Sequence, residues 1–159
     1  MSRSMIFSTL LVSLAAIAPA SAGPGTPGHS HGAFSAGEPG NPKRSARVVQ
    51  VTMDEADGKM RFVPDRVEIK RGQQVKFVLK NAGLLEHEFV LATSEENIKH
   101  AEEMKKNPDM EHDDPNAKRV MPGKGSTILW RFTRRGEFEY GCLIPGHREA
   151  GMIGRIIVK

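Results

Sequence analysis

The chain has 159 residues, of which 23 are Lys or Arg and 19 are Asp or Glu, so its net charge is +4 at neutral pH. The basic residues are mixed with acidic ones and form no block with interleaved aromatic residues, which argues against a nucleic-acid-binding protein. The mild positive balance suits an acidic protein partner. The length suits one domain with a single hydrophobic core.

Residues 1–22 have the pattern of a secretory signal peptide. Arg3 precedes a short apolar run, and Ala20-Ser21-Ala22 provides the A-x-A end at which such leaders are cleaved. A membrane anchor is the alternative, but two serines and Pro19 interrupt a run that is shorter than the roughly 20 apolar residues of a spanning helix. We therefore expect cleavage after residue 22, export, and no membrane span afterwards.

Residues 23–45 are mostly Gly, Pro, Ser, Ala and His and offer little to bury, so we expect a flexible, disordered tail. The folded domain is expected to span residues 46–159. Within it, Val75, Phe77 and Leu79 alternate with polar residues, the period of a half-buried strand. Strands are predicted at 46–53, 60–62, 66–70, 74–80, 88–92, 127–133, 137–140 and 155–158, with a turn at 54–58.

Only one segment has a helical pattern, at residues 95–105, with Ser94 as the expected N-cap. Residues 107–124 are polar and interrupted by proline, so we expect a loop there. Several short strands at regular spacing are typical of a sandwich or a barrel. The predicted fold class is all-β with one short inserted helix.

Cys142 is the only cysteine in the chain, although an exported protein could form disulfides. It lies in the segment Tyr140-Gly-Cys142-Leu-Ile-Pro-Gly-His147-Arg-Glu-Ala-Gly-Met152, between two predicted strands. This loop would present a thiolate, an imidazole and a thioether at one end of the sandwich. His87 stands at the start of another predicted strand and is expected to reach the same end.

Two imidazoles, one thiolate and a weakly bound thioether match the general pattern of a blue-copper electron-transfer site. Taken singly, a Cys or a Met is more often a buried core residue, but the glycine-rich loop and the exported free thiol favour a metal. Structural zinc usually takes more Cys or His and no Met. The predicted copper ligands are His87, Cys142, His147 and Met152.

These motifs resemble those of the cupredoxins. Cys142-Leu-Ile-Pro-Gly-His147 is similar to the azurin ligand loop, and residues 60–77 and the Asn81-to-His87 segment are similar to the first-sheet and first-ligand patterns of that family. The resemblance covers about residues 46–159, and it implies a Greek-key β-sandwich with one type 1 copper ion at one pole.

Two features depart from the family pattern. The spacing from His147 to Met152 is one residue longer than in azurin and equals that in plastocyanin, so the sequence leaves the colour of the site open. Glu88 stands where cupredoxins commonly have Asn. Its backbone N–H could still donate to the Cys142 sulfur, with Ile144 N–H as a second donor, and such bonds tune the reduction potential.

Further soft ligands outside this loop are candidates for a second copper site. His100 and Met104 are spaced i, i+4 and lie on one face of the predicted helix. Alternatively, Met104 and Ile98 form a buried stripe and the histidines are incidental. The layout resembles that of periplasmic cupredoxin-like copper-tolerance proteins. The candidate secondary ligands are His29, His31, His100, Met104, Met110 and His112.

Three functions remain open at this point. The first is copper tolerance, in which the protein binds or redox-buffers copper. The second is a soluble one-electron shuttle that meets a periplasmic cytochrome or another redox protein through the edge of His147. The third is a structural sandwich without metal. No pattern of an enzyme active site stands out, so we expect no catalysis. The candidate docking patch for a redox partner is Leu84, Leu85, Leu143, Ile144 and Pro145.

Overall fold

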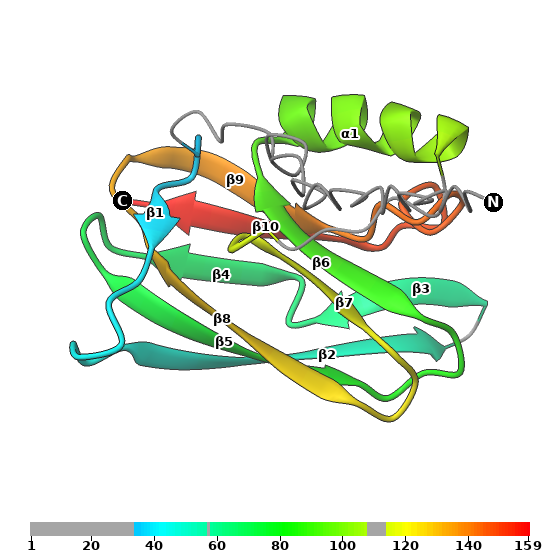
Figure 1. The fold of residues 1–159 in the computed structure, drawn as a ribbon, viewed down its shortest axis with the longest axis horizontal. Coiled ribbons are helices and arrows are strands. Elements are labelled where there is room, and N and C mark those ends of the chain that lie inside the picture. Colours follow the sequence, from blue (N-terminus) through cyan, green and yellow to red (C-terminus); the bar gives the residue numbers. More distant parts are fainter. Residues whose placement is uncertain (1–33, 57, 108–113) are drawn as a thin grey trace, which may run out of the picture. The chain divides into compact units, whose positions relative to one another are not determined.

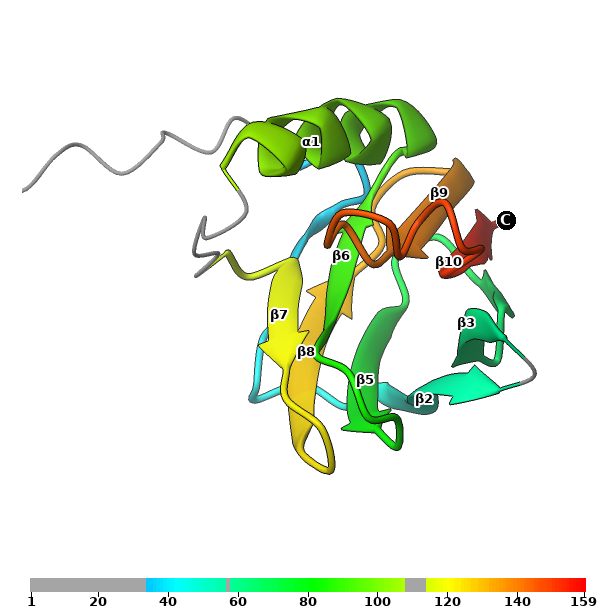
Figure 2. The same cartoon turned by 90° about the vertical axis from the view of Figure 1, so that its right-hand side faces the viewer.

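The structure is a computed structural model that describes residues 34–56, 58–107 and 114–159. The described strands form two five-stranded sheets, packed as a sandwich (Figures 1 and 2), with the orders β1-β8-β5-β2-β3 and β4-β10-β9-β6-β7. The first sheet contains β1 (Glu38–Pro39), β2 (Arg47–Ala56), β3 (Lys59–Val63), β5 (Gln74–Asn81) and β8 (Gly125–Arg131). The second contains β4 (Arg66–Ile69), β6 (His87–Ala92), β7 (Ala117–Val120), β9 (Gly136–Gly141) and β10 (Ile153–Val158).

The strand pairing confirms the predicted Greek-key sandwich. Strands β2 and β5 pair in parallel, as do β4 and β10, while the other pairs are antiparallel. The helix α1 (Ser94–Lys106) connects β6 to β7 and lies over β6 and β9. No helix in the described part of the chain is long and apolar enough to cross a membrane.

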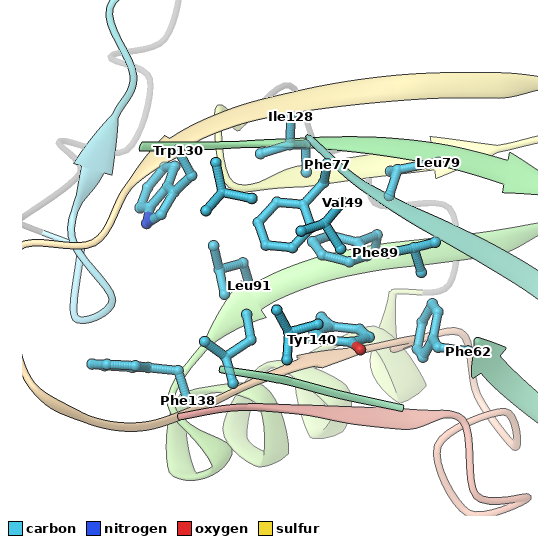
Figure 3. Packing of buried hydrophobic residues seen from close by; sticks show 14 of the residues in the cluster. Val49, Phe62, Phe77, Leu79, Phe89, Leu91, Ile128, Trp130, Phe138 and Tyr140 are labelled. Atoms are coloured by element: carbon cyan, nitrogen blue, oxygen red, sulfur yellow. The ribbon is translucent and has the colours of Figure 1, made fainter. Parts of the chain in front are cut away.

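Aromatic side chains from both sheets fill the space between them (Figure 3). Phe77 from β5, Phe89 from β6 and Tyr140 from β9 are fully buried. The Phe89 and Tyr140 rings stack with their centroids 4.9 Å apart, and Phe62 packs edge-on against Tyr140 at 5.2 Å. Since Tyr140 precedes Cys142 by two residues, this core fixes the end of β9 from which the ligand loop departs.

Gly154 leaves the space that the Tyr140 ring occupies. A Cβ atom at this position would lie 2.0 Å from Tyr140 Cε2. We expect Gly154→Ala to lower the free energy of unfolding by about 3 kcal/mol, because the core must shift to admit the methyl group. Urea unfolding of the metal-free protein would measure this effect.

Gly72→Ala is the matched control for this substitution. Its added methyl group would meet no atom within 4 Å, although the residue has φ of +83°. We expect a loss of about 1 kcal/mol from the left-handed backbone alone. Equal losses in the two variants would show that the close approach at Gly154 is unimportant.

Residues 34–45 differ from the expected flexible tail, because they pack on the sandwich. Ala36 is buried, and its carbonyl oxygen accepts a hydrogen bond from Trp130 Nε1 at 3.3 Å. Phe34 packs edge-on against the Trp130 ring, and the short strand β1 pairs with β8. Composition could not reveal this segment, since backbone pairing and hydrogen bonds to residues distant in the sequence hold it. Residues 23–33 of the predicted tail, with His29 and His31, and the predicted signal peptide lie outside the described residues.

Three local predictions were wrong by small margins. The N-cap of α1 is Thr93 and not Ser94, because the Thr93 side chain accepts from Glu96 N–H and forms a capping box. Strand β2 continues to Ala56, where a turn was expected, since Asp54–Ala56 pair with β3. The expected loop 107–124 contains β7, a four-residue strand that pairs with β6 and is too short and polar to be seen in the sequence.

Candidate metal centre

The candidate metal centre lies at the end of the sandwich where β6 begins and β9 ends. These two strands are antiparallel, so His87 at the start of β6 lies near Cys142, which directly follows β9. The loop from Cys142 to Met152 is closed by backbone bonds from Cys142 N to Met152 O and from Met152 N to His147 O, both of 3.1 Å. Gly146 within this loop has φ of +90°, which glycine adopts without strain.

Three of the four predicted ligands bring their donor atoms together. His147 Nδ1 lies 3.3 Å from His87 Nδ1 and 3.3 Å from Cys142 Sγ. Two nitrogens at about 2.0 Å from one metal ion are roughly 3.3–3.5 Å apart, so the spacing suits a shared ion. His87 and Cys142 are fully buried, and 9% of His147 is exposed. The thiolate and imidazole donors of this cluster fit copper.

The fourth predicted ligand, Met152, is fully buried and ends the same loop. The backbone hydrogen bond from Met152 N to His147 O keeps Met152 close to the ligand His147, as a thioether ligand requires. Its coordination of the ion stays a prediction.

The sulfur of Cys142 is held by two backbone donors, as the sequence predicted. Glu88 N–H donates to Sγ at 3.3 Å, and Ile144 N–H is the second donor. Burial nevertheless raises the pKa of the Cys142 thiol to about 12. Burial also lowers the pKa of His147, and the nearby His87 adds to this effect. Without metal, Cys142 is therefore a thiol and His147 a neutral imidazole at neutral pH.

Copper binding is consequently expected to release about one proton per ion at neutral pH, since the ligand is the thiolate. The apparent affinity should rise about tenfold per pH unit between roughly pH 6 and 8, because the pKa of Cys142 lies above this range. Competition titrations against a chelator at several pH values would measure it. An affinity independent of pH would mean that Cys142 is already deprotonated in the metal-free protein.

A buried polar cluster joins the ligand loop to helix α1, and the sequence analysis missed it. Arg148, which follows His147, pairs with both carboxylate oxygens of Glu139 in β9. Asn97 of α1 donates to Glu139 Oε1 at 3.0 Å and to Val90 O at 3.2 Å. The Arg148 and Glu139 side chains are only 13% and 8% exposed. No local sequence pattern predicts these contacts, because Arg148, Glu139 and Asn97 come from three separate elements.

The candidate secondary ligands are only partly described by the structure. Met104 is fully buried and packs with Val90, Ala101 and Leu143 under the helix, as expected of a core residue. Ile98, predicted to share this stripe, is 52% exposed, because the buried face of α1 carries Asn97 instead. Among the residues that the structure describes, only His87, Cys142 and His147 form a metal-binding group of His, Cys, Asp or Glu. Met110 and His112 lie outside these residues.

The predicted docking patch is only partly present at the surface. Leu84 is 88% exposed and Leu85 is 45% exposed, whereas Leu143 is buried in the small core under α1. Pro145 is exposed and Ile144 half-buried. Leu143 was therefore wrongly assigned to the patch, because its side chain points to the helix.

The fold and the His-Cys-His cluster together define a cupredoxin. Residues 49–159 match the copper-binding proteins of the plastocyanin/azurin family, and the chain belongs to this family. It is 44% identical over 143 residues to the copper-resistant cuproprotein CopI of Rubrivivax gelatinosus, covering 83% of this chain and 85% of the relative. It is 33% identical over 152 residues to CopI of Pseudomonas aeruginosa, covering 77% and 82%.

A comparison of structures supports the same fold. Auracyanin B superposes with a TM-score of 0.63 over 80% of this chain and 99% of the auracyanin chain, at 21% identity. The similarity to relatives with a role in copper resistance agrees with the layout noted in the sequence.

Proposed function

We propose that the protein is a periplasmic type 1 copper protein that serves copper tolerance and cycles between Cu(I) and Cu(II). The proposed ligands are His87, Cys142, His147 and Met152. The observation that carries the proposal is the buried cluster in which two imidazole nitrogens and one sulfur converge. The relatives named copper-resistant cuproproteins support the physiological role. The proposed role is binding and redox buffering of the ion, with no catalysed reaction.

Bound copper would supply a centre that accepts and releases one electron, and the chain controls its surroundings. Because the Cys142 and histidine side chains are buried, they would keep bulk water away from a bound ion and limit its reaction with other molecules. The two N–H donors to Cys142 Sγ and the closed loop 142–152 hold the ligands in one arrangement. A ligand set that keeps the same arrangement in both oxidation states suits the binding of copper as Cu(I) or as Cu(II).

Growth in elevated copper would test this function. Deletion of the gene is expected to lower the copper concentration that the cells tolerate, and the unaltered gene should restore it. The Cys142→Ala gene should fail to restore it at equal protein level, because this variant lacks the thiolate. Unchanged growth of the deletion strain in copper would contradict the proposed role, whatever the metal content of the protein.

An electron shuttle is the second candidate, favoured by the exposed side chains of Leu84 and Leu85 in the loop before His87. If a redox partner docks there, Leu84→Asp should slow electron exchange with a periplasmic cytochrome while leaving the copper spectrum unchanged. Stopped-flow mixing would measure the rate. Lack of exchange with every candidate cytochrome would count against this role.

A further inference from the structure

The carboxylate of Glu55 contacts the side of the His87 ring that faces away from the metal cluster. Glu55 lies near the end of β2, and its Oε1 is 2.6 Å from His87 Nε2. The other ring nitrogen, Nδ1, lies 3.3 Å from His147 Nδ1. The carboxylate also accepts backbone hydrogen bonds from Leu84 N at 2.8 Å and Leu85 N at 3.2 Å. The Glu55 carboxylate therefore holds both the His87 imidazole and the loop that precedes His87.

The loop is shaped around this carboxylate. A Cβ atom on Gly83 would lie 2.4 Å from Glu55 Oε2 and 2.5 Å from Oε1, so a side chain at this position would displace the carboxylate. Asn81 holds the loop in place, since its Oδ1 accepts from Gly83 N at 2.9 Å. Its Nδ2 donates to Leu85 O at 2.7 Å and to Val120 O at 2.8 Å. Several independent contacts thus fix the position of the Glu55 carboxylate.

We propose that Glu55 is a positioning residue for the ligand His87, and that its charge favours Cu(II) over Cu(I) and so lowers the reduction potential. This inference rests on the proposed copper site. A carboxylate acceptor keeps the hydrogen on Nε2 and leaves the Nδ1 lone pair for the metal. Carboxylate–histidine–metal arrangements orient the ring and raise the basicity of the ligand.

The direction of the effect follows from the charges of the site. A Cu(II) ion, the Cys142 thiolate and the Glu55 carboxylate sum to zero, whereas the same groups with Cu(I) carry one net negative charge. Because net charge is costly where the ligands are buried, the carboxylate stabilises the oxidised state. A residue that only anchored the loop would affect both oxidation states alike.

Glu55→Gln is the decisive variant, because it keeps the size of the side chain and an oxygen acceptor but removes the charge. We expect the thiolate-to-copper absorption to persist, the Cu(II) affinity to fall about tenfold and the Cu(I) affinity to change little. This corresponds to a reduction potential about 59 mV higher for a one-electron couple. Redox titration and separate Cu(I) and Cu(II) competition titrations would measure these values.

Glu86→Gln is the matched control, since it removes the same charge from a residue directly next to His87 in the chain. Glu86 Oε1 lies 3.5 Å from Arg119 Nε, and the carboxylate that contacts His87 Nε2 belongs to Glu55 and not to Glu86. The Glu86→Gln potential should stay close to that of the unaltered protein. An equal shift in both glutamine variants would show a general charge effect and overturn the specific role of Glu55.

Two other outcomes would overturn the proposal. One is a Glu55→Gln protein that binds copper with the potential of the unaltered protein. If Glu55→Gln does not fold, Glu55→Asp is the substitute, because it keeps the charge close to the ring. The reduction potential of Glu55→Asp should then stay near that of the unaltered protein. A shift that corresponds to a tenfold change in the ratio of Cu(II) affinity to Cu(I) affinity would overturn the proposal. If the unaltered protein showed no thiolate-to-copper absorption, the proposed copper site itself would be wrong.

Discussion

Replacing Cys142 with alanine is expected to abolish the intense thiolate-to-copper absorption and to lower the copper affinity by at least about a hundredfold. The reason is that Cys142 contributes the only sulfur anion of the cluster, and the two remaining imidazoles hold copper weakly on their own. Visible absorption and a competition titration of the purified variant would measure both effects. Its far-ultraviolet circular dichroism should match that of the unaltered protein.

Met152→Leu is the matched control for Cys142→Ala. Both residues are fully buried in the same loop, but the thioether is expected to be the weak axial ligand. This variant should keep the absorption band, with a changed position or intensity. If Cys142→Ala retained the band, or if Met152→Leu lost copper as completely as Cys142→Ala, the proposed ligand roles would be wrong.

Arg148→Ala is expected to lower the free energy of unfolding of the metal-free protein by about 3 kcal/mol, because it leaves the buried carboxylate of Glu139 without its cation. The Asn97 bond to Glu139 remains and cannot neutralise the charge. Urea unfolding followed by circular dichroism would measure the loss. The double variant Arg148→Ala/Glu139→Gln should recover part of it, since no unpaired charge remains.

Lys159→Ala provides the contrast for this ion pair. Lys159 pairs with Glu68, but both side chains are about half exposed or more, so solvent weakens the attraction. We expect no measurable change in stability. If Arg148→Ala behaved in the same way, the link between helix α1 and the ligand loop would contribute nothing to the fold.

The ligand loop could be predicted from the sequence because its chemistry is local. Cys142, His147 and Met152 lie within one short segment, and their residue types are rare enough to be informative together. His87 was predicted because it stands at the start of a strand, and antiparallel pairing of β6 with β9 brings it to the same end. The alternation of Val75, Phe77 and Leu79 likewise predicted the buried face of β5.

The contacts that surround the ligands could not be predicted, because they depend on the register of distant strands. Glu55 reaches His87 across 32 residues of sequence, and Arg148 meets Glu139 and Asn97 only after β9 and α1 have packed. The two missed strands, β1 and β7, are two and four residues long, so no period can be recognised in them. Tertiary pairing, and not local preference, makes them strands.

A Cu(II) titration of the purified protein, with visible absorption and analysis of bound metal, tests the central claim most directly. We predict an intense thiolate-to-copper band that saturates at one equivalent of copper. Additional copper bound without this band would locate further ions at other ligands, such as the histidines of the N-terminal segment, and would favour the tolerance role. Copper that binds without any such band, or no binding at all, would contradict the type 1 site and leave Cys142 a buried thiol.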